Sequence, residues 1–297
     1  MPPRPLIPRR AAALPAALVP AGLLQACLMP ACLMLACLLP AAAGCVPPAK
    51  PPRLVAPATR IRVATASDLR PCLDALADAF QQDFPNVDLL PTFGASGTLV
   101  EQLRSGLEAD LFLSADVDLA HDLAAAGLAA AEDVFETGQG RVVVWVRNES
   151  PLDVAGKGAG VLRDGGVRRV AIAHPRHAPY GRAGRAALEA HGLLAELEPK
   201  LAVGSSAAQA AQYVESGAAE AGILPLALAR GRKLSETGRH WTFPADAHPP
   251  IRHGGVILAR AIDREATVAF RDFLLSPRGR AVLERHGFEF PTAAPAP

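Results

Sequence analysis

The groups in this chain that could do chemistry are hydroxyl and backbone N–H groups at the starts of four predicted helices. Ser67 ends a predicted strand and precedes an amphipathic helix, and Ser96 stands in a glycine-flanked loop just before a second helix. Tyr180 opens a third helix and Ala207 opens a fourth. The first turn of a helix carries N–H groups without an intrahelical acceptor and the positive end of the helix dipole. If the four helix starts face one volume, they predict a site that holds a dianion through neutral donors.

Each of these residues also has a simpler, structural interpretation. A serine before a helix usually serves as its N-cap. A tyrosine at a helix start often packs on a neighbouring loop, and Ala207 can act only through its backbone. Taken one at a time, the four positions therefore leave both interpretations open.

The other reactive residues do not form the pattern of a metal or catalytic site. His174 and His177 make an H-x-x-H pair, but no cysteine pair or acidic cluster accompanies them, so we interpret them as loop residues. The glycine-rich loops lack the lysine and serine of a phosphate-binding loop, and there is no G-x-S-x-G nucleophile motif. An enzyme would need a nucleophile or an acid/base pair that the four helix starts do not offer. The sequence thus predicts a protein that is not an enzyme and that uses no cofactor and no metal.

The elements that must position these groups alternate along the chain from Arg60 onward, which is typical of an α/β fold. Apolar residues at three- and four-residue steps over 69–84 predict an amphipathic helix. The run RVVVWVR (141–147) predicts a strand that follows a loop and crosses between lobes. Further strands are expected at 61–66, 86–92, 110–113, 167–174, 200–204, 220–224 and 251–259, and further helices at 98–105, 181–191, 206–216 and on both sides of Ser276.

The N-terminal segment, residues 1–44, predicts an export signal. It begins with basic residues, continues with a long apolar stretch, contains no acid and ends in small residues. An uncleaved membrane anchor is the alternative, because the apolar stretch is longer than an ordinary signal core, although its internal prolines weaken that alternative. A Pro-rich tether, 45–57, follows the signal.

The cysteines are concentrated in the same N-terminal region. Four of the five cysteines precede residue 46, and Cys72 alone lies beyond it, which excludes a disulfide framework in the folded part. The run Ala-Ala-Gly-Cys that ends at Cys45 is similar to the cleavage site of a bacterial lipoprotein, with Ala in place of the usual Leu. Cys45 is therefore the expected lipidation site, and Cys37 and Cys27 are the alternatives.

The charge balance excludes some partners. The chain has 30 basic and 29 acidic residues, a formal net charge of +1, which argues against nucleic acid because nucleic-acid binding needs a dense basic footprint. Without residues 1–44, which hold three arginines and no acid, 27 basic residues face 29 acidic ones, a net charge of −2. Since such a protein cannot attract an anion by its overall field, an anion site must be built from local dipoles.

The segments around the four helix starts are what give the chain a family resemblance. From about residue 60 to 290, the chain resembles the molybdate-binding proteins of bacterial ABC importers, within the type II periplasmic-binding-protein class. The order and spacing of the segments support the resemblance, and the DLFLSAD run at its distance from FGASGTL is the most specific part. The segments are ATASDL (64–69), FGASGTLVEQLRSGLEADLFLSAD (93–116), HAPYGRAGRAAL (177–188), AAQYVESGAAEAGILP (210–225) and HPPIRHGGVIL (248–258).

The resemblance implies an α/β fold of two lobes joined by crossover strands, with the ligand in the cleft between them. Lobe I is expected to take residues 58–140 and 244–291, and lobe II residues 141–243. Residues 292–297 are then a tail.

The resemblance also implies which residues bind the oxyanion. Ser67 and Ser96 match the two serine ligands of the family in the first lobe. Tyr180 and Ala207 stand where the second lobe offers backbone N–H groups. Some members add a tyrosine hydroxyl just after the strand that matches GIL (222–224), but here that place is Pro225. The hydroxyl of Tyr180 is an alternative donor.

The function that follows from the resemblance is the capture of molybdate or tungstate outside the cytoplasm by a monomeric protein that delivers it to an ABC permease in the membrane. Another oxyanion such as sulfate and a non-transport anion sensor remain as alternatives. A ferric-binding protein is disfavoured, because the two tyrosines of the chain are not adjacent. We further expect the Asp68 carboxylate to stay out of the cleft, near the free N–H groups of the first helical turn, because a carboxylate against a dianion is a costly like-charge contact.

Overall fold

The computed structural model describes residues 59–290. The predicted export signal, the tether, the lipidation site Cys45 and the tail lie outside the described residues. Within them the strands form two five-stranded sheets, each built from both parallel and antiparallel pairs.

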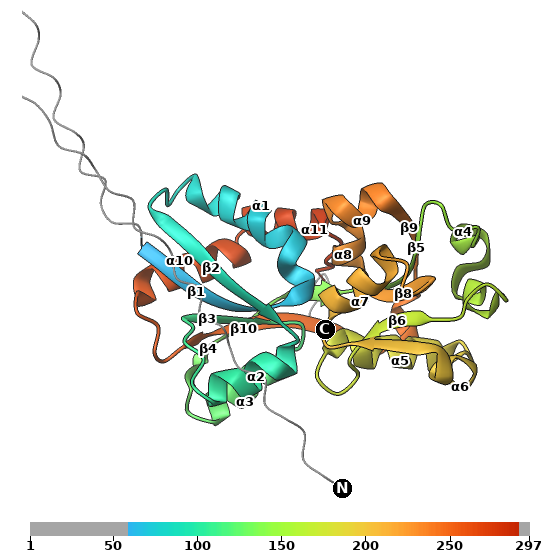
Figure 1. Ribbon diagram of the computed structural model, residues 1–297. Helices are drawn as coiled ribbons and strands as arrows, with labels where there is room; N and C mark the ends of the chain where they lie inside the picture. The colour runs from blue at the N-terminus through green and yellow to red at the C-terminus, as the bar shows by residue number, and fades with distance from the viewer. Residues whose placement is uncertain (1–58, 291–297) are drawn as a thin grey trace, which may run out of the picture. The chain divides into compact units, whose positions relative to one another are not determined.

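The first sheet has the strand order β2-β1-β3-β10-β4 (Figure 1). Strands β2, β1 and β3 run parallel, whereas β10 is antiparallel to both β3 and β4. The strands are β1 (Thr59–Ala66), β2 (Val87–Gly94), β3 (Leu111–Ser114), β4 (Ala129–Gly140) and β10 (Ile251–Leu258).

The second sheet has the order β7-β6-β8-β5-β9. Strand β5 lies antiparallel between β8 and β9, and its first five residues, VVVWV, are fully buried. A strand that is covered on both faces has a continuous apolar sequence. The VVVWV run therefore predicts this strand directly. The strands are β5 (Val142–Arg147), β6 (Val170–Ala173), β7 (Leu201–Gly204), β8 (Ala221–Pro225) and β9 (Gly238–Thr242).

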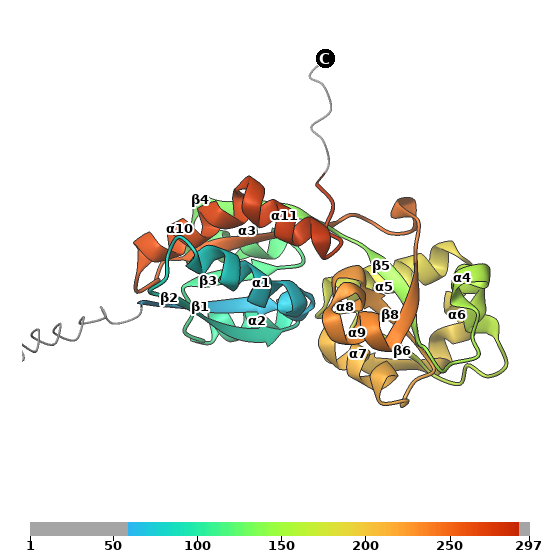
Figure 2. The same cartoon turned by 90° about the horizontal axis from the view of Figure 1, so that it is seen from above.

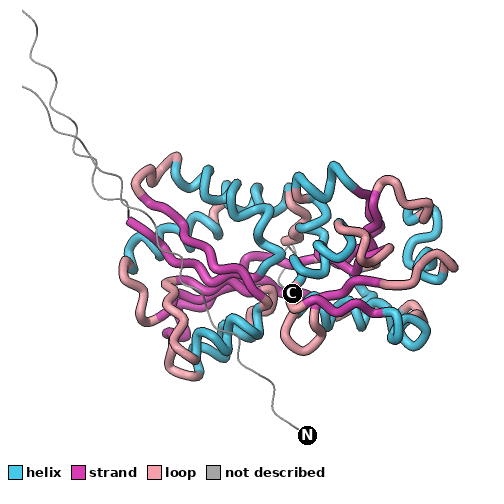
Figure 3. Tube along the Cα trace, viewed as in Figure 1, coloured by secondary structure: helices cyan, strands magenta, loops and turns pink. Residues whose placement is uncertain are grey.

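Helices cover both sheets (Figure 3). Helix α1 shows why the sequence forms them: its residues Leu73, Leu76 and Phe80 share one face and are buried, and a proline stands in its first turn, where no N–H bond is lost. The helices that pack with the first sheet, or on its helices, are α1 (Arg70–Gln81), α2 (Ser96–Arg104), α3 (Asp118–Ala125), α10 (Arg264–Leu275) and α11 (Pro277–Arg285). Those that pack with the second sheet, or on its helices, are α4 (Val154–Lys157), α5 (Pro179–Ala190), α6 (Leu194–Leu197), α7 (Ala207–Glu215), α8 (Leu226–Arg230) and α9 (Arg232–Thr237). Short 3₁₀ turns occupy Ser67–Leu69, Gly158–Arg163, Glu198–Lys200 and Ala245–Ala247.

The chain passes from the first sheet to the second and back. Strand β4 ends at Gly140 and β5 begins at Val142 in the other sheet, while the return runs from the end of β9 at Thr242 to the start of β10 at Ile251. Figure 2 shows these connections between the two groups of elements, which we call lobe I and lobe II after their first and second sheets. The predicted two-lobed α/β fold is confirmed.

The largest error of the sequence reading lies just before the crossover. A loop was expected before residue 141, but residues 129–140 form the twelve-residue strand β4, paired along its length with β10. Its sequence, AAAEDVFETGQG, is poor in strand-forming residues. Asp133 in this strand is buried and forms an ion pair with Arg264 at 2.7 Å. Pairing with a neighbouring strand and with a distant arginine outweighs local strand propensity, which depends strongly on context.

Candidate functional site

The four predicted site residues meet at one cavity. Ser67, Ser96, Tyr180 and Ala207 all line one small hollow, with room for about 10 Å³ in this closed arrangement. The serines come from lobe I and the other two residues from lobe II. Each of the four is at most 4% exposed. The structure therefore brings together every position that the sequence selected.

Ser67 sits where β1 turns into helix α1. It begins the 3₁₀ turn Ser67–Leu69, and neither this turn nor α1 has a side-chain cap, so Ser67 does not serve as the N-cap that was the alternative to a ligand. Its Oγ instead accepts a hydrogen bond from the backbone N–H of Ala208, at 3.3 Å, in the first turn of α7 in lobe II. Because a hydroxyl can accept and donate at once, the Ser67 O–H proton stays available to the cavity.

Ser96 is placed in the same way at the start of α2. The helix begins at Ser96 itself, with Ala95 as the uncapped N-cap residue, so this serine is not a cap either. Its Oγ accepts the backbone N–H of Ala115 at 3.1 Å. This bond fixes the hydroxyl oxygen and leaves its O–H free to donate to an acceptor in the cavity.

Lobe II contributes two helix starts. Tyr180 is the second residue of α5 and Ala207 the first residue of α7, whose N-cap, Ser206, accepts the N–H of Gln209 at 3.3 Å. N–H groups in these positions have no intrahelical acceptor. Together with the start of α2, they bring three positive dipole ends to one cavity.

The lobes are in contact around the cavity. Gly97 in α2 donates its N–H to the carbonyl of His177 in the other lobe at 2.9 Å, and a Cβ at position 97 would come within 2.9 Å of the same carbonyl oxygen. Glycine is thus required for this close approach. The Ser67–Ala208 bond is a second contact between the lobes.

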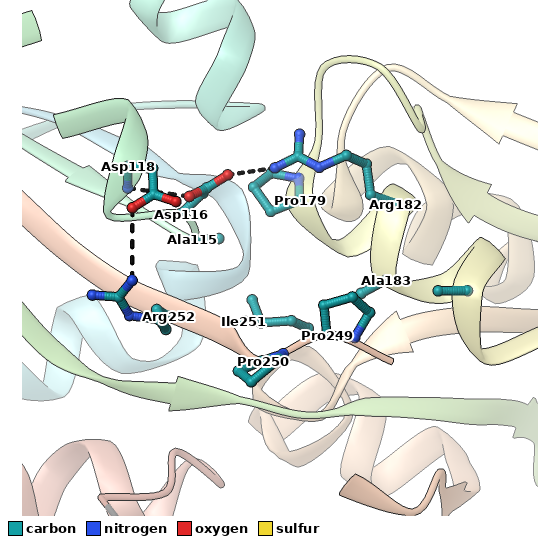
Figure 4. A pocket seen from close by; sticks show the side chains of 11 residues that line it. Ala115, Asp116, Asp118, Pro179, Arg182, Ala183, Pro249, Pro250, Ile251 and Arg252 are labelled. Atoms are coloured by element: carbon teal, nitrogen blue, oxygen red, sulfur yellow. Dashed lines mark hydrogen bonds and ion pairs between the residues drawn. The ribbon is translucent and has the colours of Figure 1, made fainter. Parts of the chain in front are cut away.

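A third contact lies in a separate, neighbouring hollow, which shares Ala115 and Pro179 with the cavity. Arg182 of α5 forms an ion pair with Asp116, which follows β3, and Figure 4 shows both side chains beside Pro179. On the lobe I side, Arg252 of β10 lies 3.7 Å from Asp118. The Arg182 and Asp116 side chains are 48% and 23% exposed, so solvent screens their attraction and the pair contributes about 0–1 kcal/mol.

One acid lies beside the cavity, against expectation. The Asp68 carboxylate was expected at the start of the helix, away from the cleft, but it is buried next to the cavity against His253 of β10 and the Tyr180 hydroxyl. His253 and Tyr180 give the Asp68 carboxylate polar partners, and both lie more than a hundred residues away in the sequence. Burial raises the pKa of Asp68 to about 7, opposed by hydrogen bonds from its own backbone N–H and from Tyr180. The carboxyl can therefore carry a proton at neutral pH, which removes the like-charge contact with a dianion.

The chemistry that this arrangement supports is the binding of an acceptor-rich group. Among the residues of 59–290 that line the cavity, none is Lys, Arg, His or Cys, and neither serine hydroxyl is hydrogen-bonded to the Asp68 carboxyl, the one acid there. What converges there are O–H donors, backbone N–H groups and helix dipoles. Such donors suit an oxyanion, because each hydrogen bond to a charged group contributes on the order of 1.5–3 kcal/mol.

The histidine pair does not enlarge the site. The rings of His174 and His177 lie 4.6 Å apart on the loop before α5, and within residues 59–290 no group of three or more His, Cys, Asp or Glu side chains is arranged to hold a metal ion. Two neighbours of the cavity were not suggested by the sequence. His253 contacts Asp68 and Tyr180, and Gly140, which lacks a side chain, leaves room for the Tyr180 hydroxyl. His253 stands in the HPPIRHGGVIL segment, but nothing in its spacing pointed to the cavity.

In the part of the chain that the structure describes, no helix is both long and apolar enough to cross a membrane.

Known proteins share this fold and sequence pattern. Residues 61–289 match the family model of the bacterial extracellular solute-binding proteins. The molybdate-binding protein ModA of Azotobacter vinelandii is 30% identical over 233 residues, which cover 78% of this chain and 91% of that protein. The ModA protein of Rhodobacter capsulatus is 32% identical over 196 residues, 66% of this chain and 75% of that protein.

A solved structure leads to the same family. The periplasmic molybdate-binding protein of Azotobacter vinelandii superposes with a TM-score of 0.72 at 29% identity, covering 78% of this chain and all of that one. The family model, the sequence relatives and the superposition all span the two lobes that enclose the cavity. The chain belongs to the bacterial extracellular solute-binding protein family.

Proposed function

We propose that this protein captures molybdate outside the cytoplasm and delivers it to an ABC permease. The observation that carries the proposal is the interlobe cavity lined by Ser67, Ser96, Tyr180 and Ala207, a set of donors without a counter-charge. The relatives named molybdate-binding proteins match the chain across both lobes, which supports this choice of anion. Tungstate is nearly the same size and charge, so the same site is expected to take it as well.

In the proposed complex, the dianion receives O–H groups from lobe I and N–H groups from lobe II. Ser67 and Ser96 donate the hydroxyl protons that their backbone contacts leave free. Tyr180 and Ala207 donate backbone N–H groups from the first turns of α5 and α7. An anion held from both sides binds the closed arrangement more tightly than the open one and shifts the population toward it.

The moving bodies in this proposal are the two lobes. We assign 58–140 and 244–291 to lobe I and 141–243 to lobe II, with the hinge at the two connections between the sheets. Hinge closure around a ligand is a common way for a binding protein to signal its loaded state. A monomer suffices for this, because each chain carries residues of both sides of the cavity.

We also propose that the chain is held at the membrane surface by a lipid. Residues 1–44 would act as the export signal, Cys45 would carry the lipid after cleavage, and 45–57 would be the tether. The family is extracellular, and a 25%-identical relative in Bacillus subtilis is called a putative substrate-binding lipoprotein.

The proposed function is tested by a thermal-shift panel of oxyanions on the purified protein. A ligand that binds only the folded state stabilises it by about 2.7 kcal/mol at a hundred times its Kd, which corresponds to a rise in Tm of roughly 5–10 °C for a domain of this size. We expect molybdate and tungstate to produce such a rise, and phosphate and nitrate to produce none. Sulfate is the arm that tests the alternative anion. A panel in which phosphate or sulfate gives the largest shift would overturn the assignment to molybdate.

A further inference from the structure

Three buried polar side chains form a cluster beside the cavity. Asp68 follows Ser67 in lobe I, His253 lies on β10 of the same lobe, and Tyr180 comes from α5 of lobe II. Their residues are 2%, 0% and 3% exposed, respectively. The cluster therefore crosses the boundary between the lobes in a place that water hardly reaches.

The three side chains converge on one nitrogen atom. His253 Nε2 lies 3.2 Å from the Tyr180 hydroxyl and 3.3 Å from Asp68 Oδ2. The contact with Asp68 has ion-pair distance but not the geometry of a hydrogen bond, so Oδ2 has no hydrogen-bond partner. The Tyr180 hydroxyl makes the hydrogen bond to Nε2, and it is the member of the cluster that comes from the other lobe.

The crossover between the lobes leaves room for this hydroxyl. Gly140 ends β4, and a Cβ at this position would overlap the Tyr180 hydroxyl and would lie 3.1 Å from His253 Nε2. Any other residue at position 140 would displace the tyrosine from the histidine. The Tyr180 hydroxyl is thus surrounded by His253 of lobe I and by Gly140 at the hinge, and not by residues of its own lobe.

The charges in the cluster favour a neutral set of partners. Burial lowers the pKa of His253 to about 3 and raises that of Asp68 to about 7. The neighbouring Cys72 of α1 has its pKa raised by burial, and Phe288 packs edge-on against the His253 ring at 4.8 Å between centroids. In the imidazole tautomer that carries its proton on Nδ1, Nε2 accepts the single O–H of Tyr180. That proton is consequently not available to an anion in the cavity.

We infer that the Tyr180 side chain is a positioning residue that joins the two lobes from inside the cleft, through His253 and Asp68, rather than a ligand of the anion. The inference rests on the proposed function, since it assumes an anion that is retained by closure. Only the backbone N–H of Tyr180 then serves the anion. The hydroxyl acts on the closed arrangement, because opening the hinge carries α5 away from β10 and breaks its bond to His253. Losing this bond raises the rate of anion release and leaves the rate of capture nearly unchanged, as is common for contacts formed after docking.

The test compares Tyr180→Phe with Tyr213→Phe in the full chain. Tyr213 is the other tyrosine of the sequence and lines a surface hollow near Lys200 and Val203, so its variant is a matched control. Affinity for molybdate is measured by calorimetry, and release by chasing radiolabelled molybdate with the unlabelled anion. We expect Tyr180→Phe to weaken binding about five- to twentyfold, the range for losing one buried hydrogen bond, almost wholly through faster release. Tyr213→Phe should match the wild type.

A double-mutant cycle separates positioning from direct ligation. The first background is His253→Gln, and Asp68→Asn replaces it if His253→Gln does not fold. In this background Tyr180→Phe should reduce molybdate affinity much less than it does in the wild type, because the partner of the hydroxyl is already altered. Equal losses in both backgrounds would make the hydroxyl an anion ligand and overturn the inference. Unchanged release from Tyr180→Phe would also overturn it, while leaving the proposed function intact. A wild-type protein that binds no oxyanion would overturn both.

Discussion

Replacing Asp68 by Asn should change how the stability of the protein depends on pH. The substitution keeps the size of the side chain and removes its titration. Burial raises the pKa of Asp68 from 3.8 to about 7, and burial lowers the pKa of its neighbour His253 from 6.5 to about 3. Both groups are inaccessible to water in the folded protein, so both prefer to be neutral there.

The two shifts act on stability with opposite sign. Because the folded-state pKa of Asp68 is raised, its contribution is fully present below pH 3.8 and is lost as pH rises through 7. Because the folded-state pKa of His253 is lowered, its contribution is present above pH 6.5 and is lost as pH falls through 3. Each changes the free energy of unfolding by about 1.4 kcal/mol per pH unit. Between about pH 4 and 6.5 the two slopes cancel in the wild type.

In Asp68→Asn only the histidine slope remains. The variant should therefore gain stability relative to the wild type as pH rises, by about 3 kcal/mol in total between about pH 4 and 6.5. Urea denaturation at half-unit steps of pH, without anion, measures this difference. The exposed Asp74 of α1 provides the control, since Asp74→Asn leaves the cluster intact. A difference between Asp68→Asn and wild type that is the same at pH 4.5 and at pH 6.5 would refute the reasoning.

The remaining predictions concern the anion site and the N-terminus. Ser67→Ala and Ser96→Ala should each weaken molybdate binding by roughly 1.5–3 kcal/mol, whereas the exposed Ser205→Ala should not; calorimetry showing wild-type affinity for both cleft variants would return these serines to a structural role. Protein extracted from membranes should begin at Cys45 and carry the mass of its acyl chains, and Cys45→Ser should abolish that added mass. An intact mass that begins at another residue and includes no acyl group would contradict the lipid assignment.

Local sequence determined much of this protein. The apolar spacing in α1 and the unbroken VVVWV run of β5 specify their structures, because a helix face or a doubly covered strand has to be apolar wherever it packs. The flanking segments likewise placed Ser67 at the end of a strand and Ser96 just before a helix. Membership of the solute-binding family confirms the prediction that the chain is a binding protein rather than an enzyme.

Tertiary structure decided what depends on residues far apart in the chain. Strand β4 forms because β10, more than a hundred residues later, pairs with it and because Arg264 neutralises the buried Asp133. The two serines, for which an N-cap was the alternative to a ligand role, accept the N–H groups of Ala208 and Ala115, because the fold brings those groups from other elements. For the same reason the Asp68 carboxylate lies beside the cavity, in a cluster with Tyr180 and His253, and not away from the cleft as expected. Periodicity and capping patterns report only on neighbours along the chain, whereas a pKa, a hydrogen-bond partner or a contact between lobes is set by whatever the fold brings alongside.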